Sequence, residues 1–371
     1  MTKLSELLRN KINITPEMQQ KAHNIYDDIA SLLKDKLAEY EPDIFVQGSF
    51  KLKTVIKPIK GDEYDLDIVC HLKIDKGQIS HFALKQLVGD ALKTKYSVAS
   101  GQLEQKNRCW RINMYGFHVD VLPAIPETDM TPYSDLIGTK LIDAPIAISD
   151  KDLKQWKTSN PRGYAIWFAE RAQQEILRRR LVVNNSKEPL PQQNIGTSIL
   201  QDAIKVMKYH RDIHFQNNLE NKPISIILTT LAARYYDGEQ SLEDALYGIV
   251  NRIKIHAPSI FDMGQIPNPV LPTENFADKW LEYPERKSAF MEWVNTLHTL
   301  LSEYVLNKGD ANAESRFLVN GFGLPASAAN YASSLKKDLA VGSLGLGTNA
   351  TIVSMANAAG QAPKYYGLKM E

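Results

Sequence analysis

The sequence predicts an α+β protein with two lobes, a strand-rich lobe over residues 41–158 and a helical lobe over residues 159–310. Short β-rich runs separated by glycine and turn residues occupy the first segment, and apolar residues at helical spacing dominate the second. Residues 1–40 precede both lobes and contain a long helical stripe that we expect to brace them. Residues 311–371 are rich in Ala, Gly and Ser, and we expect them to form a mobile C-terminal tail.

The composition limits the class of protein. The chain has 371 residues, 43% of them hydrophobic, which is enough for two packed lobes. Its 44 basic and 43 acidic residues leave a net charge of only +1. Proteins that bind long nucleic acids are usually strongly basic, so the charge gives no strong sign of such a partner. The two cysteines, Cys70 and Cys109, are expected to be buried thiols in a reducing compartment. No stretch approaches the roughly 18 apolar residues of a membrane span, so we expect a cytoplasmic protein without membrane contact.

The first predicted element is a long helix over residues 15–40. Thr15 can cap its start, and Pro16 suits the first turn because the N–H that proline lacks would be unpaired there. Apolar residues recur at the spacing of a helical stripe: Met18, Ala22, Ile25, Ile29, Leu32, Leu33 and Leu37.

A β-rich run over residues 44–47 follows and stops at Gly48 and Ser49. Gly48 lets the backbone approach a ligand closely, and Ser49 offers a hydroxyl and an amide at the start of a helical turn. Such a corner suits phosphate oxygens, although an isolated Gly-Ser pair is most often a plain turn.

Two aspartates stand at the start of the next β-rich run, which continues to residue 72. Asp65 and Asp67 are two positions apart, so they project from the same face of a strand. Carboxylates held this close repel each other and raise each other's pKa unless a cation lies between them. Hard oxygen ligands favour Mg²⁺ or Mn²⁺. The alternative is that the pair is only a solvated strand start, which is what an isolated Asp-x-Asp most often is.

A predicted hairpin supplies a third carboxylate. Residues 108–122 alternate in polarity and turn at Tyr115 and Gly116. Asp120 falls in the middle of the second, apolar strand, where a lone carboxylate is costly without a partner. Backbone amides could be that partner, and so could a cation held by the two earlier aspartates. The three features in this order form a much stronger signal than any one of them.

Helical spacing dominates the chain after residue 160. Three arginines at residues 178–180 would end the first of these helices, where they match the helix dipole. The predicted helices span residues 80–96 in the strand-rich lobe, then 163–181, a helix beginning near 197, 223–236, 241–256, 286–306 and a short one at 329–339.

The ordered motifs resemble the nucleotidyltransferase superfamily of DNA polymerase β type and, within it, the bacterial CD-NTases, relatives of animal cyclic GMP–AMP synthase. The likeness covers roughly residues 15–306. The matching segments are Gln47-Gly48-Ser49, Asp65-Leu66-Asp67, residues 117–124, residues 160–164 with Trp167-Phe168, residues 207–211 and residues 267–270.

The resemblance implies a bilobed enzyme that joins nucleoside triphosphates, ATP or others, into a cyclic di- or trinucleotide, a second messenger of antiphage defence. It implies that Asp65 and Asp67 bind two Mg²⁺ ions, with Mn²⁺ possible, and that Asp120 binds the ion facing the attacking hydroxyl. The nucleotide-binding residues that it implies are Gln47, Gly48, Ser49, Lys208 and Ser225.

Two of these residues also have ordinary structural interpretations, because Lys208 lies on the polar face of an amphipathic helix and Ser225 could be a small packing residue. The chain departs from the family pattern in two places. Residues 50–64 make a long connection between the Gly-Ser corner and the acidic strand. Ile226 follows Ser225 where some animal relatives have a tyrosine that stacks on a base, so base stacking must come from elsewhere.

Two other functions stay open from the sequence. One is a linear nucleotidyltransferase or polymerase acting on RNA, a small molecule or a protein, and the other is a catalytically silent nucleotide-binding scaffold. The resemblance also implies a downstream effector that binds the product. In some relatives a ubiquitin-like conjugation enzyme acts on the C-terminus, although the acidic Glu371 is not an obvious conjugation end.

Overall fold

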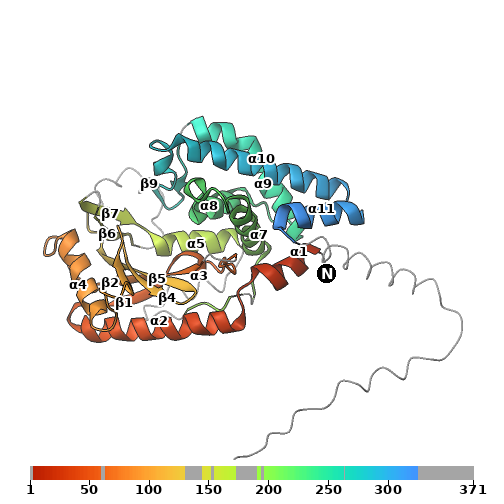
Figure 1. Ribbon diagram of the computed structural model, residues 1–371. Helices are drawn as coiled ribbons and strands as arrows, with labels where there is room; N and C mark the ends of the chain where they lie inside the picture. Colours follow the sequence, from red (N-terminus) through yellow and green to blue (C-terminus); the bar gives the residue numbers. More distant parts are fainter. Residues whose placement is uncertain are drawn as a thin grey trace, which may run out of the picture. The chain divides into compact units, whose positions relative to one another are not determined.

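The structure is a computed structural model that describes residues 3–59, 63–129, 144–151, 154–172, 190–193, 196–262 and 264–324. It confirms the predicted α+β class, with a mixed sheet in one lobe and helices in the other (Figure 1). Both lobes belong to one compact unit that ends at Gly323.

The described strands of the first lobe form one mixed sheet. Its order is β1-β2-β5-β4-β3, and β6 pairs with the far half of β5 and with β7. The strands β2 and β5 run parallel, and the other neighbours run antiparallel. The bounds are β1 Asp43–Val46, β2 Tyr64–His71, β3 Leu103–Gln105, β4 Trp110–Met114, β5 Phe117–Pro126, β6 Ile146–Asp150 and β7 Gln155–Ser159.

Alternation along β2 and β5 separates the two faces of this sheet. One face is apolar and packs against α2 (Pro16–Lys36) and α4 (His81–Lys93), with Leu66, Ile68, Val119 and Val121 in a shared core. The carboxylates point to the opposite face. Figure 1 shows α2 running along the sheet on the side away from the helical lobe. The predicted cap is confirmed, because Thr15 Oγ1 accepts a hydrogen bond from the amide of Met18 at 3.2 Å.

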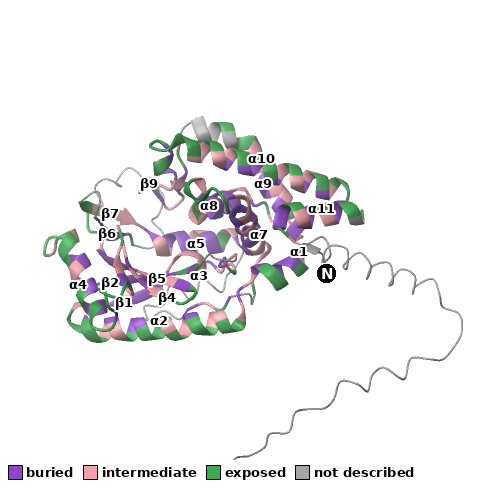
Figure 2. Ribbon diagram, in the orientation of Figure 1, coloured by how far each residue is buried: buried purple, intermediate pink, exposed green. Residues whose placement is uncertain are grey.

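The helical lobe is built around α7 and α8, which are buried along most of their length (Figure 2). Among the described residues, no helix has the length and apolar character needed to cross a membrane. Residues 178–180 lie outside the described part. The remaining helices are α1 Lys3–Leu7, α3 Gly48–Lys51, α5 Pro161–Arg171, α7 Ile199–His214, α8 Ser225–Tyr235, α9 Leu242–Asp262, α10 Pro284–Leu306 and α11 Ala311–Phe322.

The structure corrects two sequence-based expectations. The predicted tail was wrong from 311 to 322, because these residues form α11, where Phe317 stacks on Tyr304 with ring centroids 4.2 Å apart. Among the side chains of α11 that the structure describes, Ala313, Phe317, Leu318 and Phe322 are buried apolar groups, a pattern that the Ala-, Gly- and Ser-rich composition of the whole segment does not reveal. The proline-rich segment before Trp280 contains an unpredicted hairpin, β8 Pro267–Asn268 and β9 Leu271–Asn275. The predicted short helix at 329–339 and the chain end proposed for conjugation lie outside the described residues.

Candidate active site

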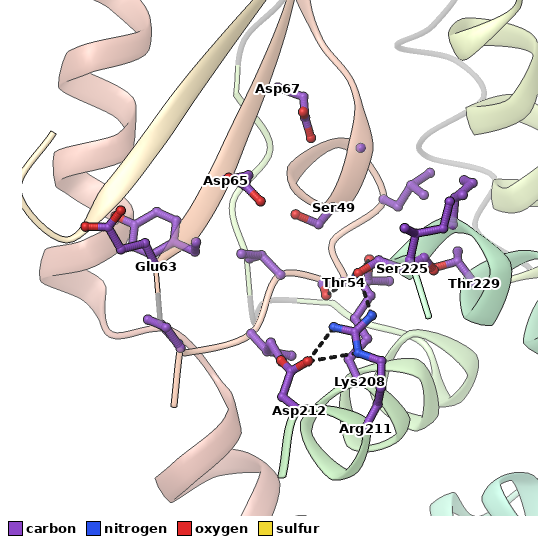
Figure 3. A pocket seen from close by; sticks show the side chains of 18 of the residues that line it. Ser49, Thr54, Glu63, Asp65, Asp67, Lys208, Arg211, Asp212, Ser225 and Thr229 are labelled. Atoms are coloured by element: carbon purple, nitrogen blue, oxygen red, sulfur yellow. Dashed lines mark hydrogen bonds and ion pairs between the residues drawn. The ribbon is translucent and has the colours of Figure 1, made fainter. Parts of the chain in front are cut away.

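A tight corner between β1 and α3 lies against the strand β2, which carries Asp65 and Asp67. Gly48 has a φ of +62°, and a Cβ placed on it would lie 2.2 Å from Oδ2 of Asp67. The amide of Gln47 donates a hydrogen bond to the backbone oxygen of Asp67 at 3.0 Å. The corner therefore has room only for glycine. The next residue, Ser49, lines the same cavity as Asp65 (Figure 3).

Strand pairing brings the three aspartates together. In the parallel β2–β5 register, Asp67 lies opposite Asp120, and Asp65 lies opposite His118. Directly paired residues point to the same side of a sheet, so the three carboxylates share one face. Desolvation, followed by the charges of Asp65 and Asp120, raises the pKa of Asp67 to about 7. Desolvation and Asp120 also raise the pKa of Asp65.

This arrangement fits a divalent cation. The three side chains supply hard oxygen ligands, and their mutual repulsion would be relieved by positive charge between them. The Gly48 corner leaves the space next to Asp67 free of any side chain of its own. Within the part of the chain that the structure describes, however, no three acidic, His or Cys side chains are already arranged as a preformed metal site.

The carboxylate of Asp120 is paired with Arg111. Its Nε and Nη2 donate to Oδ1 and Oδ2 of Asp120 at 2.8 and 2.7 Å, and its Nη2 is 3.8 Å from Oδ1 of Asp65. The sequence interpretation did not include Arg111 in the site, although the predicted hairpin could have indicated its position. A two-residue turn at Tyr115 and Gly116 sets the hairpin register, which places Arg111 opposite Asp120.

The opposite wall of the site comes from the helical lobe. Lys208 on α7 donates through Nζ to the backbone oxygen and to Oγ1 of Thr54, at 3.0 and 3.1 Å. Desolvation and the neighbouring Arg211 lower the pKa of Lys208 to about 7, while Asp212 and Asp67 act in the opposite direction. Lys208 is thus a buried amine that links the helical lobe to the loop after the Gly-Ser corner (Figure 3).

Ser225 begins α8 at the same wall. Its Oγ accepts a hydrogen bond from Nη1 of Arg211 at 3.0 Å, and the same guanidinium binds Asp212 through Nε at 2.8 Å. Ile224, at the N-cap position, supplies no capping side chain. The amide of Ile227 donates to the backbone oxygen of Ile224 at 3.2 Å, and the dipole of α8 favours an anion at this end of the helix.

These walls enclose a cavity of about 730 Å³, within the size range of a small-molecule site. Of the eight predicted site residues, six line it, and Gln47 and Asp120 do not. The six are Gly48, Ser49, Asp65, Asp67, Lys208 and Ser225. Polar lining residues that the sequence interpretation missed are Thr54, Glu63, Arg111, His118, Arg211, Asp212, Lys222 and Thr229.

Comparison with known proteins identifies the family. Residues 42–123 match the family described as "Cyclic GMP-AMP synthase DncV-like, nucleotidyltransferase domain". The chain is also 32% identical over 304 residues to the c-di-GMP synthase of Roseivirga ehrenbergii, an alignment that covers 80% of this chain and 77% of that protein. The chain is a CD-NTase. It is a nucleotidyltransferase, as the motifs predicted.

Further likenesses show that the fold is shared across both lobes. The cyclic dinucleotide synthase CdnG of Bradyrhizobium diazoefficiens is 24% identical over 325 residues, covering 79% of this CD-NTase and 73% of CdnG. The structure of CdnG with GTP superposes with a TM-score of 0.66 at 20% identity, over 89% of this chain and 98% of that one. Vibrio cholerae DncV, solved with the linear intermediate 5′ pppA(3′,5′)pG, gives 0.58 at 17% identity over 88% and 96%. The domain match ends at residue 123, before Lys208 and Ser225, so the helical-lobe side of this CD-NTase site rests on geometry.

Proposed function

We propose that this CD-NTase converts nucleoside triphosphates into a cyclic dinucleotide, with GTP as a substrate. The observation that carries the proposal is the cavity, which has Asp65, Asp67 and the Gly48-Ser49 corner on one wall and Lys208 and Ser225 on the other. The similarity to a c-di-GMP synthase supports guanine as a base.

In each transfer, an oxygen of the acceptor ribose forms a bond to the α-phosphorus of the donor. The bond from that phosphorus to pyrophosphate breaks, and the acceptor hydroxyl loses its proton. The linear product then presents its own triphosphate as donor, and a second transfer closes the ring. Because charge spreads over phosphoryl oxygens in such transition states, positioning and electrostatics supply most of the catalysis.

The chain's own residues would share this work. Lys208 and the N-terminal turn of α8, with Ser225, would bind the donor triphosphate, and Ser49 would bind it from the opposite wall. Asp65, Asp67 and Asp120 would hold the divalent cations. Two such ions, Mg²⁺ or Mn²⁺, would lower the pKa of the acceptor hydroxyl and neutralise the leaving pyrophosphate.

Product analysis tests the proposal. With Mg²⁺ and a mixture of the four nucleoside triphosphates, we expect a phosphatase-resistant cyclic dinucleotide, and GTP alone should give c-di-GMP by mass spectrometry. A phosphatase-sensitive linear product, or a labelled protein or RNA acceptor, would replace the proposal with the linear alternative. No product from any mixture would indicate a silent nucleotide-binding scaffold.

The biological role that we propose is antiphage signalling through an effector that binds the cyclic product. Phage should form fewer plaques on cells that carry the synthase together with an effector that binds its product than on cells that carry the effector alone. An Asp67→Asn synthase should remove that protection. Equal protection by the variant would separate the defence role from nucleotide synthesis.

The buried Lys208 predicts a pH dependence of nucleotide binding. A triphosphate favours the charged amine, so binding without divalent cation should take up protons above pH 7, where Lys208 of the free protein, with a pKa of about 7, is largely neutral. The affinity should therefore fall by up to about tenfold for each pH unit above 7. Calorimetry with a nonhydrolysable GTP analogue in EDTA, in buffers of different ionisation enthalpy, measures this uptake.

Two variants make this pH prediction specific. Lys208→Met should bind more weakly and lose the proton uptake. Lys205, one turn earlier on α7, is also buried, but it is not among the cavity-lining residues, so Lys205→Met should keep the uptake. Unchanged uptake in Lys208→Met would refute the assignment of Lys208 to the triphosphate.

A further inference from the structure

The acidic face of the sheet already contains a cation of its own. Arg111 on β4 lies opposite Asp120 in the hairpin register and forms two hydrogen bonds with it, at 2.7 and 2.8 Å. The same guanidinium is 3.8 Å from Asp65. Its side chain is 27% exposed and lines the cavity.

These contacts determine which way Asp120 faces. Each of its two carboxylate oxygens accepts one N–H of the guanidinium, and Asp120 is absent from the cavity lining. A bidentate, charge-assisted pair of this kind is among the stronger side-chain interactions. Asp65 and Asp67, by contrast, reach the cavity. The third carboxylate is therefore held by the arginine rather than presented beside the other two.

Charge makes the arginine and a metal ion competitors. Three carboxylates on paired strands need positive charge to lie so close, and Arg111 supplies it in the metal-free protein. A divalent cation coordinated by Asp120 would need an oxygen that now bonds the guanidinium. It would also be repelled by a guanidinium that stayed in place.

We propose that Arg111 is a placeholder cation, which neutralises the carboxylates of the metal-free enzyme and leaves Asp120 when divalent cations bind. The proposal rests on the metal-dependent transfer proposed above and adds a positioning residue to it. By holding Asp120 close to Asp65, Arg111 keeps the carboxylates assembled before the ions arrive.

The experiment compares Arg111→Met with the same substitution at Arg162, which lies at the start of α5 and pairs with Asp43 of β1. Arg162 also forms a bidentate pair, with Asp43 at 2.8 and 3.2 Å, and the two side chains are 24% and 22% exposed, against 27% and 16% for Arg111 and Asp120. The Arg162–Asp43 pair lies outside the active-site cavity. Both variants lose a paired arginine, but only one loses it at the proposed metal site.

The readouts are Mn²⁺ affinity, by electron paramagnetic resonance, and thermal stability with EDTA or with Mg²⁺. Asp67→Asn provides the background for Mn²⁺ bound elsewhere. Arg111→Met should bind Mn²⁺ about tenfold more tightly than wild type, because a competing charge is gone. It should melt at a lower temperature in EDTA and recover more than wild type on adding Mg²⁺. Arg162→Met should melt lower by the same amount in both buffers and bind Mn²⁺ as wild type does.

Several outcomes would overturn the placeholder. Unchanged or weaker Mn²⁺ binding by Arg111→Met would show that the arginine stays on Asp120 and orients it in the loaded site. Absence of Mn²⁺ binding above background in wild type would refute it too. If Arg111→Met fails to fold, Arg111→Lys serves instead, because it keeps the charge but cannot form the bidentate pair, and a two- to threefold gain in affinity (about 0.5 kcal/mol) is expected. A wild type that binds Mn²⁺ competitively with Arg111 yet makes no cyclic product would refute the proposed function and leave this inference standing.

Discussion

Replacing Asp67 by Asn is expected to reduce product formation by about 10³-fold or more while the protein stays folded, since charge stabilisation by metal ions contributes several kcal/mol in such sites. The variant keeps the size of the side chain and removes the charge that would hold the cations. Asp67 lies opposite Asp120 and beside the Gly48 corner, so no other described carboxylate occupies its place. Initial rates from GTP with Mg²⁺ measure the loss.

Asp67→Asn is expected to lose activity without losing thermal stability. Burial and the neighbouring aspartates raise the pKa of Asp67 in the folded state to about 7, above the value for an unfolded chain. The folded protein therefore binds the extra proton more tightly, and its stability falls as the pH rises from about 4 to 7. Asn carries no such charge, so Asp67→Asn in EDTA at pH 8 should melt no lower than wild type.

Asp150 supplies the control for this result. It lies at the end of β6, almost fully buried, and pairs with Arg108 at 2.8 Å outside the cavity. Asp150→Asn should lower the melting temperature and leave the rate per folded enzyme unchanged. Near-normal synthesis by Asp67→Asn, or an equal loss in both variants, would remove the metal-binding role of Asp67.

Gly48→Ala should reduce activity by about 10²-fold, the loss that a misplacement of roughly 1 Å can cause. The added Cβ would lie 2.2 Å from Oδ2 of Asp67, so the carboxylate or the corner must move. The φ of +62° adds a backbone cost of about 1–2 kcal/mol for an L-residue. Steady-state rates and melting temperatures separate the two effects.

The hairpin glycine provides the comparison. Gly116 has a φ of +85°, and a Cβ there would meet nothing within 4 Å. Gly116→Ala should show the backbone cost alone, with normal activity. If both glycine variants lose stability equally and neither loses activity, the close approach of Gly48 to Asp67 has no catalytic importance.

Much of the sheet side of this site was predictable because local rules govern it. The two-residue spacing of Asp65 and Asp67 places them on one face of any strand. The turn at Tyr115 and Gly116 sets the hairpin register, and with it the pairing of Arg111 and Asp120. The caps and apolar stripes of the helices likewise depend on residues within one or two turns of each other.

The sequence by itself determined that Asp65 and Asp67 share one face of a strand, and it located most of the helices, although it missed α11. Only the tertiary structure decided that β2 lies parallel to β5 with Asp67 opposite Asp120, and that Lys208 reaches Thr54 across the two lobes. Side-chain periodicity depends only on neighbouring residues. These contacts, by contrast, join segments far apart in the sequence, and the residues between them do not determine the strand register. These contacts form only when the two lobes pack together, because the cavity is lined by charged and polar residues from both of them.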